Sequence, residues 1–496
     1  MGFKQDAEFA ANVSMGAAGT ARIGRVLRDD HGHRPIELER YSMANKVWRT
    51  KVKRKRLPDL LCLRCGQRFE VRAKSKPGIV LSHSEQPERR WNEGGMRRED
   101  LFAFARVGLK RHGSYHVGMP TFIDLRALSA VVQLGKLSAP KAASAGSEMT
   151  MTWPSWVPSR SGTVEGVDDE GQILFRQDGG RVQRYWHWRE WGEGNRHLYV
   201  EPGSPIAAGD AIVAGAVPSA SPECAGNTWD VAAALEAEEE TERYAAIKAA
   251  GILRRTDLAQ QLARIAAETS DWRMGLEALG ALARLDPRTW TRRIADLAAD
   301  GHDAGEAQME AVFILSEIAS EEAAAGLADV ARDAANRVEL RAAAAWGLGR
   351  GAHPSPDLLL PLIESPETMV SLHAIVALES LPAGRIAELA STLDSPDDRL
   401  AASAARVLSR HRCVEALLQA ARGGGRARLW ALGALGDLPA EVVRQSAGGP
   451  LDGEIERALE PMWLAQRDWL RGDEGREGLE ALDVQTVRFD PVDLSG

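Results

Sequence analysis

The chain has few cysteines and no long apolar run, and both shortages narrow what it can be. It holds 4 cysteines in 496 residues, too few for a disulfide framework at this length. Cys224 and Cys413 stand alone, and we interpret them as small buried hydrophobes. No stretch approaches the roughly 18 consecutive apolar residues of a membrane helix. We therefore expect no membrane partner and only one cysteine pair of interest.

Several common signatures are also missing. The sequence shows no complete Walker loop, no Ser-His-Asp order and no dinucleotide fingerprint in a suitable context. The first residues, MGFKQDAEFAANVS, lack the charged, apolar and small-residue order of a signal peptide, which favours a cytoplasmic location. With 44% hydrophobic and 27% charged residues the composition is that of a globular protein.

Positive charge is scarce over most of the chain and concentrated near its beginning. Residues 1–110 carry 24 Lys and Arg against 13 Asp and Glu, which gives +11, and the total of -8 leaves -19 for the remainder. Such a basic run attracts polyanions, because each neutralised phosphate releases counterions; a solvated basic surface is the alternative. We predict contacts with nucleic acid, DNA being the expected form, from Lys51, Lys53, Arg54, Lys55 and Arg56.

Changes in local pattern divide the chain into five parts. We expect an α/β domain over 1–138, a linker over 139–152, a small barrel-like all-β domain over 153–222, an α-solenoid over 230–470 and a cap or tail over 471–496. In the first part, ELERYSMANKVWRTKVKRK and REDLFAFAR predict helices, and DLLCL with RFEVRAK predicts a strand pair joined by a turn at Gly66.

An Ala-x-x-x-Leu pair recurs through the second half of the chain. The seven copies are Ala249/Leu253, Ala278/Leu282, Ala311/Leu315, Ala344/Leu348, Ala374/Leu378, Ala404/Leu408 and Ala431/Leu435. Copies about 30 residues apart leave room for two short helices each, which predicts an α-solenoid; one irregular helical bundle is the alternative. The acidic balance of this half favours a protein partner.

The repeat pattern resembles HEAT-like repeats of the short, phycobilisome-lyase type over about residues 230–440. This resemblance implies an architecture of stacked helix pairs. Taken literally, it also implies a lyase-like activity on bilin or modified proteins, although nothing outside the repeat supports that activity. The repeat therefore predicts a scaffold first.

The predicted hairpin places acidic and basic side chains together. Side chains two apart on a strand share a face, so Glu70, Arg72 and Lys74 project to one side, and Asp59 can meet them across the hairpin. Two carboxylates there can hold Mg²⁺ or Mn²⁺, while a nearby cation orients the attacking water. In the alternative interpretation, Asp59 is a turn residue after proline and the strand face carries solvated, paired charges.

Pro58-Asp59, followed after ten residues by Glu70-x-Arg72-x-Lys74, resembles the PD-(D/E)xK superfamily, the fold of restriction endonucleases and junction resolvases. The resemblance covers about residues 20–125 and implies a metal-dependent endonuclease, with cutting as a homodimer in many members. It implies metal ligation by Asp59 and Glu70, assistance by Arg72 or Lys74, and an additional acid at Glu37 or Glu39.

The sequence departs from this motif at one position. Arg72 stands where the pattern has lysine, so either Arg72 serves or Lys74 replaces it. The departure supports a second hypothesis, a non-catalytic scaffold with a degenerate nuclease fold that binds nucleic acid and protein. A nuclease joined to a repeat array suggests a role in defence or repair.

Cys62-Leu-Arg-Cys65-Gly66 has the spacing of a zinc knuckle, because two residues between thiolates and a following glycine let both sulfurs reach one ion. A structural zinc site needs four ligands, and the sequence leaves the other two open: His31, His33, His83 or another subunit. A hairpin packed with small thiols and a redox pair are the alternatives.

Overall fold

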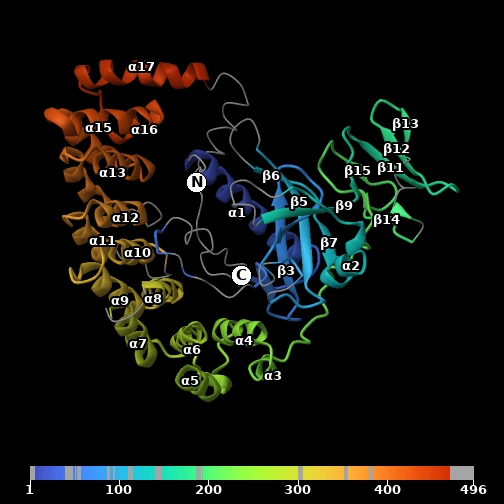
Figure 1. Ribbon diagram of the computed structural model, residues 1–496. Coiled ribbons are helices and arrows are strands. Elements are labelled where there is room, and N and C mark those ends of the chain that lie inside the picture. The colour runs from blue at the N-terminus through green and yellow to red at the C-terminus, as the bar shows by residue number, and fades with distance from the viewer. Residues whose placement is uncertain are drawn as a thin grey trace. The chain divides into compact units, whose positions relative to one another are not determined.

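The protein is described from a computed structural model (Figure 1). The structure describes residues 6–38, 48–50, 52, 57–86, 90–92, 95–109, 115–139, 148–185, 191–192, 194–299, 305–350, 356–378 and 384–469. The chain divides into two compact units, Met1–Ala44 with Arg54–Ala245 and Gly478–Gly496, and Asn45–Lys53 with Ala246–Glu477. None of the helices among the described residues combines the length and apolar character that a membrane span requires.

The first unit contains a six-stranded mixed sheet. Its elements are α1 (Asp6–Asp29), β1 (Pro35–Glu37), β2 (Leu60–Cys62), β3 (Arg68–Lys74), β5 (Leu101–Leu109), β6 (Tyr115–Val117) and β7 (Thr121–Asp124). The strand order is β1-β2-β3-β5-β6, and β7 also pairs with β5. β3 and β5 run parallel, and the other pairs are antiparallel. Helix α1 packs on β3 so closely that a Cβ on Gly19 would lie 2.3 Å from the Cβ of Ala73.

Further short strands follow in the first unit. They are β4 (Ile79–Ser84), β8 (Lys136–Leu137), β9 (Glu148–Trp153), β10 (Ser155–Trp156), β11 (Gly162–Val167), β12 (Ile173–Gln177), β13 (Val182–Tyr185), β14 (His197–Leu198), β15 (Pro205–Ile206) and β16 (Ala214–Gly215), with α2 (Leu125–Ala130) and η3 (Val132–Leu134) among them. β9 pairs with β4 along its whole length, so the end of the expected linker over 139–152 is a strand of a sheet. Trp153 is buried there against Trp91.

One predicted helix of the first part is wrong, and a second lies mostly outside the described residues. Residues 98–106 mostly form β5, because the run is buried on both faces: Leu101 and Ala103 face one core, and Phe102 and Phe104 another. Strands buried on both faces lose the polar alternation that identifies a strand. Of the second predicted helix, over 37–55, the structure describes residues 37–38, 48–50 and 52: Glu37 ends strand β1, and residues 48–50 are bent. The other residues of this prediction lie outside the described ones.

The second unit is a helical solenoid. Its helices follow the short α3 (Val231–Ala234) and are α4 (Glu240–Ile252), η6 (Thr256–Leu258), α5 (Ala259–Glu268), α6 (Trp272–Leu285), α7 (Pro287–Ala299), α8 (Gly305–Glu317), α9 (Glu321–Arg332), α10 (Val338–Leu348), α11 (Pro356–Ile363), α12 (Thr368–Leu378), η7 (Gly384–Asp394), α13 (Asp398–Arg410), α14 (Val414–Arg422), α15 (Gly425–Gly436), α16 (Ala440–Ser446) and α17 (Gly453–Trp469). Successive helices pack into two rows, α6-α8-α10-α12-α13-α15-α17 and α7-α9-α11-η7-α14-α16.

Six of the seven copies of the sequence repeat fall on helices of one row, and the first falls on α4. The seven Ala-x-x-x-Leu pairs fall on α4, α6, α8, α10, α12, α13 and α15, the last leucine of the α4 pair lying just past its end. The alanines are fully buried in every copy. Small residues are required because the helices touch: a Cβ on Gly251 would lie 2.7 Å from the Cα of Ala281. The predicted solenoid is therefore confirmed.

Candidate metal centre

The CxxC sequence lies in the turn between β2 and β3, and this hairpin forms as predicted. Gly66 has φ +71°, a left-handed conformation that glycine adopts without steric cost. A Cβ at this position would also lie 2.6 Å from the ring of Trp229. The backbone amides of Arg34 and Arg64 both donate to the Cys62 sulfur at 3.4 Å. The turn thus presents its sulfurs inward with backbone support.

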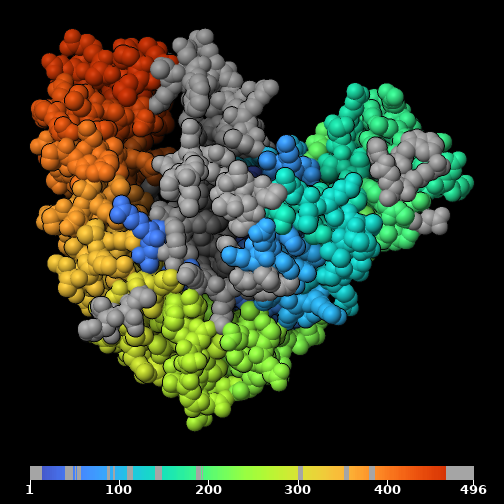
Figure 2. Space-filling model, in the orientation of Figure 1, coloured from blue at the N-terminus to red at the C-terminus, as the bar shows by residue number. Residues whose placement is uncertain are grey.

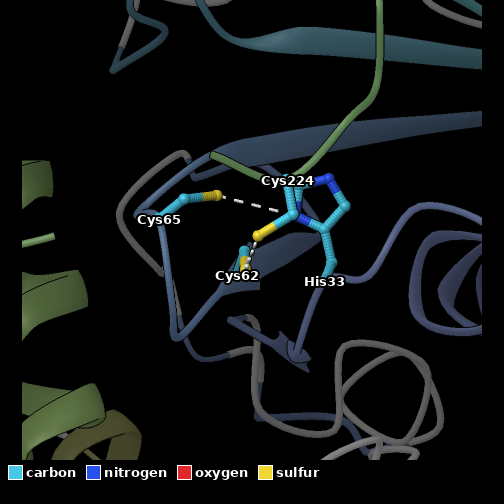
Figure 3. Close-up of side chains that lie close together, drawn as sticks. All are labelled: His33, Cys62, Cys65 and Cys224. Carbon is cyan, nitrogen blue, oxygen red and sulfur yellow. Dashed lines mark hydrogen bonds between the residues drawn. The ribbon is translucent and has the colours of Figure 1, made fainter. Parts of the chain in front are cut away.

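Two more ligand-type side chains meet the cysteine pair. His33 comes from the loop between α1 and β1, and Cys224 from the segment after β16. The Sγ atoms of Cys62 and Cys224 lie 3.9 Å apart, and Cys65 Sγ lies 3.6 Å from His33 Nδ1. All four ligand atoms lie within 4.8 Å of one another, and the side chains converge in Figure 3. Among the described residues, this is the one such group of three or more His, Cys, Asp or Glu.

Two of the distances between these atoms fit a tetrahedral zinc ion. Zinc–sulfur bonds of about 2.3 Å and zinc–nitrogen bonds of about 2.0 Å place two sulfurs about 3.8 Å apart and a sulfur and nitrogen about 3.5 Å apart. The observed 3.9 and 3.6 Å agree with both values. A disulfide would require about 2.05 Å, so Cys62 and Cys224 are free thiols. Three cysteines and one histidine form a recognised structural zinc set.

A second interaction orients the histidine. His33 Nε2 lies 2.5 Å from the carbonyl oxygen of Pro222, so this nitrogen donates its proton and leaves the lone pair of Nδ1 facing the thiols. Metal-binding histidines are commonly fixed by such a hydrogen bond from the other ring nitrogen. His33 is also buried, with its ring against the edge of Phe69.

The pKa values of Cys62 and Cys65 are shifted in opposite directions. The hydrogen bond with the Cys65 thiol is the largest cause that lowers the pKa of Cys62, to about 3, and His33 and the Arg34 amide act in the same direction against the effect of burial. The bond to Cys62, together with burial, raises the pKa of Cys65. Zinc is bound by thiolates, so metal binding would release the remaining thiol protons.

The segment that carries Cys224 forms hydrogen bonds with the loop before β1 and with the turn between β2 and β3. The Cys224 amide donates to the His31 carbonyl at 3.1 Å, and the Thr228 amide donates to the Arg64 carbonyl at 3.1 Å. The Arg64 guanidinium in turn donates to Gly32 O at 2.8 Å and to the side chain of Asn227 at 3.1 Å. Three segments far apart in sequence therefore meet at the cluster.

The sequence predicts part of this cluster. Cys62 and Cys65 are predicted zinc ligands and His33 is one of the open choices, whereas Cys224 is interpreted there as an isolated buried thiol; zinc binding itself stays a prediction. Cys224 lies 162 residues from Cys62, and no local spacing connects the two. His31 instead pairs with Glu223 at 2.9 Å, and His83 lies on β4 outside the cluster.

The structure also places the hairpin acids. Asp59 Oδ2 accepts the Val71 amide at 2.7 Å, which brings its carboxylate across the hairpin to β3. Glu70 pairs with Arg72 at 2.5 Å, and Lys74 Nζ donates to the Val80 carbonyl at 2.9 Å. The predicted shared face of β3 is therefore present, and its charged groups are engaged within the unit.

Other predicted positions have different outcomes. Glu37, expected as a helical acid, lies in β1 opposite Leu60. Glu39 lies outside the described residues, as do all five predicted contacts with nucleic acid: Lys51, Lys53, Arg54, Lys55 and Arg56. The roles of these six residues stay predictions.

Part of the positive charge near the hairpin serves the fold itself. Arg68 is fully buried and binds both oxygens of Asp100, at 2.9 and 2.5 Å, and it also donates to Thr241 Oγ1 at 2.9 Å. Asp100 further accepts the Arg97 amide at 2.7 Å. A buried guanidinium paired in this way offers nothing to a phosphate.

Comparisons with known proteins assign no family. No family model matches the chain, and no curated protein matches it. Among solved structures, human deoxyhypusine hydroxylase in complex with glycerol is 17% identical, covering 37% of this chain and 73% of that chain, with a TM-score of 0.23.

Two further matches have similar values. The YibA protein of E. coli is 16% identical over 47% of this chain and 90% of its own, with a TM-score of 0.26. The complex of CpcE and CpcF of phycocyanin lyase from Nostoc is 19% identical over 49% of this chain and 100% of its own, with a TM-score of 0.25. TM-scores this low carry no argument about this chain, so its solenoid is established from its own helix packing.

Proposed function

We propose that the protein is a non-catalytic scaffold whose solenoid holds a protein partner and whose zinc-braced first unit holds nucleic acid. The observation that carries this proposal is the ligand set His33, Cys62, Cys65 and Cys224, whose ligand atoms lie within 4.8 Å of one another. Catalytic zinc keeps one position for water or substrate, whereas four protein ligands close the coordination sphere. Such an ion would stabilise the unit and perform no chemistry.

The contacts of the hairpin support the same conclusion. Asp59 is bound to the β3 backbone and Glu70 to Arg72, so both carboxylates already serve the hairpin. The lysine of the nuclease motif is replaced by that same Arg72. These features favour a domain that does not cut nucleic acid over an active nuclease.

The solenoid supports a protein partner. Residues 230–470 carry 38 Asp and Glu against 25 Lys and Arg, a net charge of -13, which repels nucleic acid. Leucines are exposed on two helices of one row, Leu429 on α15 and Leu464 on α17, with exposed fractions of 71% and 51%. Exposed apolar side chains on stacked helices provide contact area for another protein.

The test is a binding and cleavage assay on the purified full chain. Duplex DNA is added at about 50 and 200 mM salt, with and without Mg²⁺ or Mn²⁺. We expect binding that weakens at the higher salt, because phosphate contacts release counterions, and intact DNA in every lane. Metal-dependent cleavage, or affinity that does not change with salt, would contradict the proposal.

A second candidate function is metal-dependent cleavage of nucleic acid with a restriction-endonuclease-like fold. One observation favours it: the Asp59 carboxylate reaches β3 at Val71, the residue next to Glu70. If cleavage occurs, Asp59→Ala and Glu70→Ala should abolish it by removing metal ligands. Asp169→Ala, at an exposed turn, is the matched control and should cleave normally.

A further inference from the structure

A short segment from the N-terminal part of the chain belongs to the solenoid unit. Asn45–Lys53 is grouped with Ala246–Glu477, whereas the residues on both sides of it belong to the first unit. Residues 48–50 and 52 of this segment are described. In Figure 1 a short blue stretch lies beside α10 and α12, and Figure 2 shows it as blue atoms against the yellow and orange helices.

The segment is anchored by a tryptophan. Trp48 is only 3% exposed. Its ring centroid lies 4.8 Å from that of His373 on α12 and 6.5 Å from that of Trp346 on α10. Trp346 packs in turn against Phe313 of α8 and carries the Arg350 guanidinium 4.9 Å above its ring. Two helices of one row, α10 and α12, thus pack rings against Trp48, and Phe313 of α8 supports Trp346 from behind.

A carboxylate holds the backbone beside this anchor. Glu339, in the first turn of α10, accepts the Arg49 amide with one oxygen. Its other oxygen accepts the Thr50 amide at 3.2 Å and the Thr50 hydroxyl at 2.8 Å. The Arg337 guanidinium lies 3.5 Å from the same hydroxyl. The Glu339 carboxylate therefore binds two backbone amides and one hydroxyl group of the segment.

The combination is that of a peptide-binding site. In grooves that bind extended segments, main-chain hydrogen bonds supply affinity and a pocket for one side chain supplies specificity. Tryptophan is also one of the residue types enriched among the dominant contacts at interfaces. Here the main-chain bonds are those to Glu339, and the pocket is that of Trp48. The solenoid row thus has the features of a binding face with a resident occupant.

We propose that this face of α10 and α12 is an exchangeable peptide-binding site whose resident occupant is the stretch that carries Trp48, Arg49 and Thr50. The competing ligand is an extended segment of the protein partner with a tryptophan, a serine or threonine two residues later, and no proline at the two positions after the tryptophan. This inference rests on the proposed function, since it names the chemistry by which the solenoid recognises its protein partner.

The experiment adds the occupant in trans. A fluorescein-labelled peptide with the sequence NKVWRTKVK, residues 45–53, is titrated into the full chain and into its Trp48→Ala variant, and anisotropy is measured. A tethered occupant acts at an effective concentration on the order of millimolar. We therefore expect the peptide to bind the variant at least about tenfold more tightly than the wild type.

Matched controls define the site. Trp290→Ala removes a partly exposed tryptophan of α7 that stacks with Arg293, and it should bind as weakly as the wild type. A peptide with alanine in place of its tryptophan should not bind either protein. Adding Glu339→Ala to the Trp48→Ala variant should weaken binding about tenfold, because charge-assisted hydrogen bonds are lost.

Two results would overturn the proposal: equal peptide affinity for wild type and variant, or no binding to a folded variant at millimolar peptide. Circular dichroism establishes folding. If the Trp48→Ala variant is unfolded, the Thr50→Pro variant is used in its place. This substitution removes the Thr50 amide and hydroxyl that Glu339 binds and keeps Trp48. The assay contains neither partner nor DNA, so a negative result here leaves the scaffold proposal to its own test.

Discussion

The first unit and the solenoid differ in how far apart in the sequence their contacting residues lie. At the candidate metal centre, His33, Cys62 and Cys224 meet from three distant segments. In the solenoid, each helix packs mainly on the helices one and two places away. Repeat arrays gain stability from contacts between neighbouring repeats, whereas the first unit depends on contacts between residues that are distant in the sequence. The comparison predicts that damage spreads through the first unit and stays local in the solenoid.

The largest effect is expected from breaking the metal centre. Cys224→Ala should remove one bound zinc per chain and unfold the first unit while leaving the helical signal of the solenoid, because structural zinc contributes on the order of 10 kcal/mol in small zinc domains. Metal analysis of protein purified without chelator, together with circular dichroism, measures both. Cys413→Ala, beside α14 and away from the cluster, is the control. Undiminished zinc in Cys224→Ala would contradict the ligand assignment.

The buried ion pair should give the next largest effect. Asp100→Ala removes the carboxylate that binds the fully buried Arg68 guanidinium at two oxygens and leaves Glu239, at 3.9 Å, as its carboxylate partner; loss of such a buried partner typically costs about 3–5 kcal/mol. Denaturant unfolding of the first unit should show this loss, and the exposed Asp169→Ala should not. A decrease in unfolding free energy below about 1 kcal/mol would mean that the pair contributes little to the stability of the first unit.

Replacing a core leucine of the repeat tests whether destabilisation stays within the solenoid. Leu315 on α8 is fully buried, so Leu315→Ala should destabilise the solenoid by about 2–5 kcal/mol. Hydrogen exchange should increase in the neighbouring helices, and zinc content should not change. Leu429→Ala, at an exposed site of the same row, should stay within about 0.5 kcal/mol. Loss of zinc in the Leu315 variant would show that the two units unfold together.

A smaller effect is expected from acid. Burial, with Arg350 nearby, lowers the pKa of His373 to about 4, below the unfolded value of about 6.5. Between these values the unfolded chain binds a proton that the folded solenoid does not. Stability should therefore be complete above pH 6.5 and fall by up to about 1.4 kcal/mol per unit as the pH drops toward 4. His373→Leu should remove that part of the slope; an unchanged slope would place the titration elsewhere.

Local pattern was sufficient where the fold is local. The Ala-x-x-x-Leu period identified one row of the solenoid, and the strands around Gly66 were found because a tight turn and alternating side chains are local features. The same reasoning failed for β5, since a strand buried on both faces has the same apolar composition as a short helix. The nuclease residues of the hairpin and the basic run stay predictions.

The sequence by itself determined the repeat, the hairpin and the pairing of Cys62 with Cys65 in one turn, because each depends on residues within a few positions of one another. Only the tertiary structure decided that Cys224 meets Cys62 across 162 residues and that Trp48 is buried against His373 of the solenoid. Contacts at that separation leave no periodicity or spacing in the sequence. They depend on which distant surfaces the packed chain brings together.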